Sequence, residues 1–371
     1  MAEATGVPRE VILSGYYGFG NVGDDALLAA LARAMLDAGV ETTAVPAGDA
    51  RALPHWPGLE ALGRQDVGEI RRRLRRGAVL FSGGGGLLQN ATSNRSLAYY
   101  LGLMALARLA RRPYAIGFQS VGPLHGALAR RATAWLACGA ADVTVRDAGS
   151  RQTLVDLGVN AARVHLAADL AFLLPPPAQP AAQPAPDGPQ LGLCLRRTRF
   201  TSQVLDAVAA WRPAGWRLVL VACQADDHEL HRALAARWPD AATVLVGPGA
   251  VAQTQAALAA CNCVVSERLH PLIFAAQAGV PAAGIVYDPK VAGLAADLDL
   301  PLAGSDESLS AAGLDAALAT LLDRGEAERA RLRAVAAAAG ERVRAALAAT
   351  LAALADCTTP SGPGEKVAGT G

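Results

Sequence analysis

Short apolar runs alternate with helix-forming stretches along most of the chain. In the first half, runs typical of buried strands cover residues 10–14, 41–45, 78–82, 113–118, 141–145 and 164–166. In the second half, equivalent runs cover residues 191–195, 216–222, 243–246, 263–265 and 282–286. Strands alternating with amphipathic helices, such as the one expected at 26–38, indicate parallel sheets covered by helices. The pattern predicts two Rossmann-like α/β domains.

A proline-rich segment separates the two halves. Residues 175–190 contain seven prolines among alanines and glutamines, a composition that cannot pack a core and is typical of an extended linker. We therefore expect an N-terminal domain at 1–174 and a C-terminal domain at 191–356. The latter would include its own C-terminal helices, either one long helix over 326–355 or two that meet near Gly340. Residues 357–371 are expected to be a disordered tail.

Composition and charge narrow the class of protein. The 371 residues are 52% hydrophobic and 18% charged, which is enough apolar material for two cores. The net charge of +1 does not suggest a nucleic-acid partner. The N-terminus lacks the pattern of a signal peptide, and no uncharged apolar run reaches membrane-spanning length, so we expect a cytoplasmic protein. The six cysteines form no CxxC pair, and we interpret them as reduced thiols rather than zinc ligands.

The stretch 261–290 places polar groups where ligands usually bind. A buried strand ends at Ser266, and a helix is expected to begin at Pro271. Arg268 and His270 lie between them, at the carboxyl end of a parallel strand and against a helix N-terminus, which favours an anion site. Lys290 follows the next strand and reaches the same rim. The alternative is that these side chains only cap and solvate the helix.

The first loop of the chain is rich in glycine. Its glycines match the GxGxxG spacing of a dinucleotide-binding loop, at Gly18, Gly20 and Gly23. The second strand, however, does not end in the acidic residue that such a site requires. Asn21, Asp24 and Asp25 are polar groups that a pyrophosphate would disfavour, so we favour a sugar-binding loop, with helix capping by Asp24 or Asp25 as the alternative.

A second glycine run follows the strand at 78–82. Gly84 and Gly85 belong to four consecutive glycines, whose conformational freedom is best explained by close approach to a ligand. Asn90, just beyond them, could bind sugar hydroxyls. A flexible turn without a ligand is the alternative.

These motifs carry a family resemblance. The chain resembles the polysaccharide pyruvyl transferases, most closely the CsaB type, in GYYGFGNVGDDALL at 15–28, SGGGGLLQN at 82–90, VRDAGS at 145–150, and RLHPLIFAAQAGVP with YDPK at 268–290. It differs in Glu267, where methionine is common, in residues 168–170, which only approximate an Asp-Pro segment, and in its long proline linker.

The resemblance implies a fold like the two-domain GT-B glycosyltransferases, with the domains facing a cleft. It implies transfer of pyruvate from phosphoenolpyruvate to two hydroxyls of one sugar, as a cyclic ketal, with release of phosphate and no cofactor or metal. The usual CsaB-type acceptor is N-acetylmannosamine in a lipid-linked or polymeric cell-wall glycan. The modified polymer anchors surface-layer proteins through their SLH domains. An enzyme at the cytoplasmic face of the membrane, with at most peripheral membrane contact, would fit this role.

The residues themselves suit such a donor. Phosphoenolpyruvate is a compact anion, for which fixed cations at strand ends are the expected partners: Arg196, Arg268 and Lys290, with Ser266 beside them. His270 is the expected general acid, acting with Arg268, because histidine titrates near neutral pH. The acceptor is expected to contact the first domain, at Asn21, Asp24, Asp25, Gly84, Gly85 and Asn90. Asp24 or Asp25 could also act as the base that accepts the hydroxyl proton.

Two other functions remain open from the sequence. A nucleotide-sugar glycosyltransferase could share this architecture, but no clear acidic contact for a ribose lies near Asp288. A non-catalytic glycan-binding protein would bind polymer without releasing phosphate.

Overall fold

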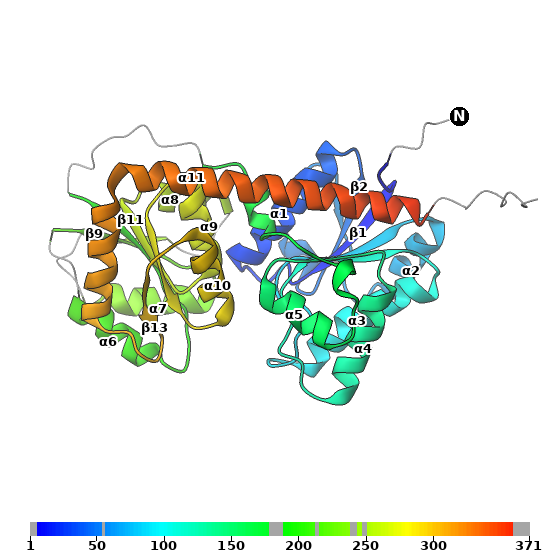
Figure 1. Cartoon of the computed structure of the whole chain (residues 1–371), viewed down its shortest axis with the longest axis horizontal. Coiled ribbons are helices and arrows are strands. Elements are labelled where there is room, and N and C mark those ends of the chain that lie inside the picture. Colours follow the sequence, from blue (N-terminus) through cyan, green and yellow to red (C-terminus); the bar gives the residue numbers. More distant parts are fainter. Residues whose placement is uncertain are drawn as a thin grey trace, which may run out of the picture.

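Two α/β domains make up the computed structural model, which describes residues 6–53, 56–177, 188–211, 215–237, 243–246 and 251–358. The domains lie side by side, and one long helix runs across both (Figure 1). The core of each domain is a sheet in which every neighbouring pair of strands is parallel. The expectation of two Rossmann-like parallel-sheet domains is confirmed.

The N-terminal sheet has the strand order β3-β2-β1-β4-β5-β6-β7. Its strands are β1 Glu10–Gly15, β2 Glu41–Pro46, β3 Leu59–Ala61, β4 Val79–Gly83, β5 Tyr114–Gln119, β6 Asp142–Val145 and β7 Val164–Leu166. Its helices are α1 Val22–Asp37, α2 Val67–Arg76, α3 Asn94–Leu109, α4 Ala127–Gly139 and α5 Ala148–Asp156, with short 3-10 turns η1 Ala50–Ala52, η2 Ala161–Arg163 and η3 Leu170–Leu173. The strand order reverses between β1 and β4, and ligands of open α/β sheets usually bind at such a point.

The C-terminal sheet has the order β10-β9-β8-β11-β12-β13. Its strands are β8 Gln190–Cys194, β9 Arg217–Val221, β10 Thr243–Val246, β11 Cys263–Ser266, β12 Ala282–Val286 and β13 Leu302–Ser305. Its helices are α6 Thr201–Trp211, α7 Ala225–Ala235, α8 Val251–Ala259, α9 Leu269–Ala278 and α10 Pro289–Leu298. The reversal here lies between β8 and β11, so β11 and α9 occupy the position that β4 and its loop occupy in the other domain.

The last helix, α11 Ala311–Asp356, belongs to both domains. It begins over the C-terminal sheet, bends at Gly325, whose φ is 59°, and ends over the N-terminal sheet (Figure 1). There Thr350 Oγ1 donates a buried 2.8 Å hydrogen bond to Asp142 Oδ2. The prediction that these helices stay in the C-terminal domain is therefore wrong. Of the two alternatives for residues 326–355, the single long helix is confirmed, because the non-helical backbone inside α11 lies at Gly325, just before that range. Glycine at 340 lets the helix approach η3, because a Cβ there would lie 2.9 Å from the Phe172 carbonyl oxygen.

Direct contacts fix the two domains against each other. The backbone N–H of Val22 donates to the Cys223 carbonyl at 2.9 Å, and the Gln277 side chain donates to the carbonyls of Ala171 and Leu174. A single buried hydrophobic cluster continues from α1 of one domain to α9 of the other. The N-termini of α1 and α9 therefore meet at the domain interface. Most of the predicted proline linker, residues 178–187, and most of the predicted tail, residues 359–371, lie outside the described residues.

Candidate active site

A small cavity, of about 100 Å³, lies between the two domains at the carboxyl ends of their strands. Its walls come from the loops after β1, β4 and β6 in one domain and after β9, β11 and β12 in the other. The lining residues are Asn21, Gly23, Asp24, Gly85, Gly86, Arg146, Cys223, Arg268, Leu269, His270, Pro271, Tyr287 and Lys290. The structure thus brings residues predicted for the donor and for the acceptor into the same space.

The helices α1 and α9 begin at this cavity. Asn21 caps α1, since its side-chain oxygen accepts a 2.9 Å hydrogen bond from the Gly23 N–H. The predicted capping by Asp24 or Asp25 is wrong, because both lie in the first turn of the helix. Helix α9 follows Arg268, and among the described residues no side chain caps it there. Unpaired N–H groups and the helix dipole make such an end attractive to an anion.

Arg146 and Asp169 form a buried ion pair behind the cavity. Arg146 Nη1 lies 2.6 Å from Asp169 Oδ2, and the two side chains are 6% and 4% exposed. Arg146 Nε also donates to Ser120 Oγ at 2.8 Å, which holds the guanidinium in place. Burial alone would raise the pKa of Asp169, but the charge of Arg146, together with His270, lowers it below its usual value. Asp169 is therefore a carboxylate that faces both Arg146 and His270.

His270 is held between the two domains. A Cβ on Gly23 would lie 2.1 Å from His270 Nδ1, so only glycine leaves room for the imidazole beside α1. On the other side, His270 Nε2 lies 3.8 Å from Asp169 Oδ1. Burial lowers the pKa of His270 to about 4, although Asp169 opposes the shift. The imidazole is therefore neutral near pH 7 before any ligand binds.

Arg268 lines the cavity but has a permanent partner. Its Nη2 lies 2.6 Å from Oδ1 of the fully buried Asp227. Burial would lower the pKa of Arg268, but the Asp227 carboxylate raises it above the usual value. Asp227 was not identified from the sequence as part of the site. Arg268 therefore contributes directed N–H donors more than an uncompensated positive charge.

Asp24 brings a second titratable group into the cavity. Burial and the neighbouring Asp25 raise the pKa of Asp24 to about 7, while Arg146 and Lys290 oppose the shift. A Cβ on Gly85 would lie 3.2 Å from Asp24 Oδ1, so glycine leaves room for this carboxyl group. Asp25 does not line the cavity, and burial raises its pKa to about 6.

The remaining donor-side residues support the cavity from behind. The Arg196 guanidinium stacks on the Tyr287 ring at 3.8 Å, so Arg196 positions a lining residue without lining the cavity itself. Ser266 is buried and fixes the turn before α9, where its hydroxyl accepts from the Arg268 N–H at 2.9 Å and donates to the Arg268 carbonyl at 2.8 Å. Lys290 does line the cavity, and its Nζ lies 3.5 Å from Asp288 Oδ2.

The residues predicted to bind the acceptor separate into two groups. Asn21, Asp24 and Gly85 line the cavity, whereas Asp25, Gly84 and Asn90 do not. The Asn90 side chain accepts from the His125 N–H at 2.7 Å and donates to Asn94, so it stabilises an exposed loop. No role in the site was predicted for Arg146 or Asp169. Both lie in segments that were compared with the family, VRDAGS at 145–150 and residues 168–170.

The family follows from comparison with known sequences. The model of the polysaccharide pyruvyl transferase family matches residues 21–289. This chain belongs to that family. The match includes every residue that lines the cavity except Lys290, which is the next residue after it. The CsaB subtype stays a prediction, and no curated protein sequence matches the chain.

Solved structures share the fold of this chain at low sequence identity. The Anabaena protein HepE, in complex with UDP and glucose, is 15% identical, with 92% of this chain and 99% of that chain covered at a TM-score of 0.62. The UDP-GlcNAc 2-epimerase from Neisseria meningitidis, bound to UDP-GlcNAc, is 9% identical, with 91% and 98% covered at a TM-score of 0.58. The likeness establishes a GT-B fold. Among the described residues, no helix is long and apolar enough to cross a membrane.

Proposed function

We propose that this protein transfers pyruvate from phosphoenolpyruvate to a sugar of a cell-wall polymer, forms a cyclic ketal and releases phosphate. The observation that supports this best is the small interdomain cavity. Arg146, Arg268 and Lys290 line it together with His270, and α1 and α9 begin there. A compact anion with a phosphate and a carboxylate is the ligand that such a cavity suits.

The proposed chemistry begins at the methylene carbon of phosphoenolpyruvate. Addition of a proton to this carbon leaves an oxocarbenium-like centre at the neighbouring carbon, which one sugar hydroxyl attacks. The bond to the phosphate then breaks, and the second hydroxyl of the same sugar closes the ring. One hydroxyl proton replaces the proton given to the methylene carbon, and the other leaves with the phosphate, so the reaction needs no external acid, oxidant or reductant.

We assign the first proton to His270, because its ring lies in the cavity and imidazole is the side chain whose ordinary pKa is nearest neutral pH. The ligand-free imidazole is neutral, since burial lowers its pKa to about 4. Binding of a multiply charged anion in the same cavity would favour the imidazolium, and Asp169 at 3.8 Å adds to that effect. Donor binding would therefore protonate the His270 imidazole, which gives this proton to the methylene carbon in the next step.

We propose N-acetylmannosamine of a secondary cell-wall polymer as the acceptor, and anchoring of SLH-domain surface-layer proteins as the role of the product. These assignments rest on the resemblance of the motifs to the CsaB type. They are consistent with an enzyme that acts at the cytoplasmic face of the membrane on a lipid-linked glycan.

Glycosyl transfer from a nucleotide sugar is the second candidate, because the protein shares its fold with structures that hold UDP or UDP-sugars. The two functions release different products. We expect the purified protein, incubated with polymer fragments that carry N-acetylmannosamine, to release inorganic phosphate from phosphoenolpyruvate and no UDP from UDP-glucose or UDP-GlcNAc. The polymer should gain label from ¹³C-phosphoenolpyruvate in mass spectrometry. UDP release without phosphate release would favour glycosyl transfer.

A further inference from the structure

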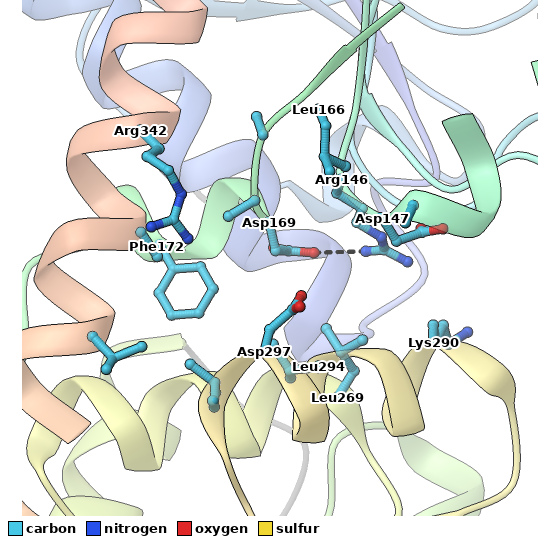
Figure 2. A pocket seen from close by; sticks show the side chains of 16 residues that line it. Arg146, Asp147, Leu166, Asp169, Phe172, Leu269, Lys290, Leu294, Asp297 and Arg342 are labelled. Carbon is cyan, nitrogen blue, oxygen red and sulfur yellow. Dashed lines mark hydrogen bonds and ion pairs between the residues drawn. The ribbon is translucent and has the colours of Figure 1, made fainter. Parts of the chain in front are cut away.

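A second cavity, of about 320 Å³, opens beside the first (Figure 2). Arg146, Leu269 and Lys290 line both cavities, so the two spaces adjoin at these side chains. The other walls come from the chain between β7 and η3, from α10 and from α11. The larger cavity thus lies where both domains and the helix that crosses them meet, and the proposed donor steps make no use of it.

The walls of this second cavity are mixed in character. The apolar part is formed by Phe172, Leu294, Leu298 and Val335, among others. Figure 2 shows Asp297 extending from α10 toward Asp169 and Phe172, with the guanidinium of Arg342 reaching down from α11 beside the Phe172 ring. A few polar groups on a mainly apolar wall, in a volume of about 300 Å³ or more, are typical of a site for a small organic ligand.

Three basic and three acidic side chains line this cavity, so its formal charges balance: Arg146, Lys290 and Arg342, and Asp147, Asp169 and Asp297. Arg146 is already paired with Asp169, and Lys290 lies 3.5 Å from Asp288. Burial raises the pKa of Asp297, Arg342 opposes the shift and Asp147 adds to it. With these charges balanced, the lining has no net positive charge that would select a second anion. A neutral polyol would instead donate its hydroxyl protons to the carboxylate oxygens, which only accept hydrogen bonds when ionised.

We propose that the second cavity binds the acceptor as an uncharged pyranose sugar, with Asp297 accepting a hydrogen bond from a hydroxyl and Phe172 and Leu294 contacting its C–H face. The inference rests on the proposed function, which makes the smaller cavity the donor site. The reacting hydroxyls would reach the donor between Arg146 and Lys290, where the cavities adjoin. The acceptor would then lie against α10 and α11, and not against the exposed loop of Asn90.

The test is sugar binding by the full-length protein, which does not depend on turnover. The probes are the methyl glycosides of N-acetylmannosamine, N-acetylglucosamine and glucose, measured by saturation-transfer NMR with phosphoenolpyruvate present. We expect Asp297→Asn to weaken binding of the preferred glycoside by about tenfold, because the sugar hydroxyl would donate to a neutral amide oxygen in place of a carboxylate. The affinity for phosphoenolpyruvate should not change.

The matched control is Asp299→Asn, two residues further along the chain. Its carboxylate is 75% exposed at the end of α10, and asparagine tolerates the left-handed backbone there, so sugar binding should equal that of the wild type. Leu294→Trp, which would fill the cavity, should abolish sugar binding while its circular dichroism stays native.

The outcomes are distinct. Wild-type sugar affinity in Asp297→Asn and Leu294→Trp, or no binding of any of the three glycosides by the wild type, would overturn the acceptor cavity. Loss of phosphoenolpyruvate affinity in Asp297→Asn would do the same, because it would assign the cavity to the donor. Sugar binding that depends on Asp297, without phosphate release by the wild type, would support the sugar cavity and contradict the proposed pyruvyl transfer.

Discussion

Asp24 places a carboxyl group in the same cavity as Arg146 and Lys290. Because its pKa is raised to about 7, the protein holds a proton at Asp24 below that pH and loses it above. An ionised Asp24 would repel an anionic donor, so donor binding at high pH must include uptake of a proton. The pH dependence of donor affinity therefore reports on this residue.

We expect donor affinity to fall as the pH rises above 7, by up to about tenfold per pH unit for one linked proton. Phosphoenolpyruvate itself contributes little there, because the second pKa of phosphate monoesters is about 6 and most of the donor is fully ionised above pH 7. Asp24→Asn should make the dependence less steep by one proton, leaving any uptake by His270, and bind the donor more tightly than the wild type at pH 9. Isothermal titration calorimetry from pH 7 to 9 measures this. An equally steep pH dependence in Asp24→Asn would show that another group takes up the proton.

Arg268 is expected to matter for stability as much as for binding. Arg268→Ala leaves the Asp227 carboxylate buried without its 2.6 Å partner. Breaking a buried pair by removing one member typically costs about 3–5 kcal/mol, so the free energy of unfolding should fall by that amount in urea titrations. The double variant Arg268→Met/Asp227→Leu removes both charges and should recover most of the stability, but not donor binding. Donor affinity equal to the wild type in that variant would exclude Arg268 from the site.

For individual residues, the sequence predicted which segments meet at the site more reliably than it predicted what each side chain does there. Arg268, His270 and Lys290 were predicted at one rim, and they line one cavity. The partner of Arg268, however, is Asp227 at the start of another helix, and spacing along the chain does not show which side chains a fold pairs. The partner of Glu267, which differs from the residue common in the family, is also distant along the chain: Glu267 accepts a partly buried 2.7 Å hydrogen bond from the Arg196 N–H.

Among the elements, the first turn of α1 fixes His270. Gly23 has no positive φ, so alanine suits its backbone, but the added Cβ would overlap the His270 ring at 2.1 Å. We expect Gly23→Ala to lower the thermal stability modestly, because the ring is buried and must be displaced, and to reduce kcat by about tenfold or more, because the proposed acid must move. Gly68→Ala is the matched control, since Gly68 is also the second residue of its helix and has open space around it. A fully active Gly23→Ala enzyme would contradict the assigned position of the imidazole.

The order of strands and helices could be predicted because apolar runs punctuated by glycine and proline mark buried parallel strands. Two strands were missed, β3 at the edge of one sheet and β13 at the edge of the other. β3 has only three residues and is largely exposed, and β13 reads Leu-Ala-Gly-Ser, so neither shows a run of apolar residues. Helix α9 begins at Leu269 rather than at Pro271, because Arg268 takes the capping position.

In the whole molecule, α11 joins the domains. Its path could not be predicted, because an alanine-rich helix has no strong apolar stripe to show which domain it covers. We expect Gly340→Ala to lower the melting temperature, since the new Cβ would meet the Phe172 carbonyl at 2.9 Å and push α11 from η3. Gly102 lies on α3 with nothing within 4 Å of an added Cβ, so Gly102→Ala should instead raise the free energy of unfolding by up to about 1 kcal/mol. Calorimetry on the two variants tests the docking, and a stabilised Gly340→Ala protein would contradict it.

We propose that His270 gives the proton that starts pyruvyl transfer in the cavity between the domains, and the other assigned roles depend on this step. The direct measurement is the reaction in D₂O with phosphoenolpyruvate and an acceptor that carries N-acetylmannosamine, followed by NMR. The wild type should place solvent deuterium in the ketal methyl group and release one phosphate per ketal. His270→Gln should still bind phosphoenolpyruvate, but its turnover should fall by about a hundredfold or more. A glutamine variant with near wild-type turnover, and deuterium still entering the methyl group, would contradict the claim.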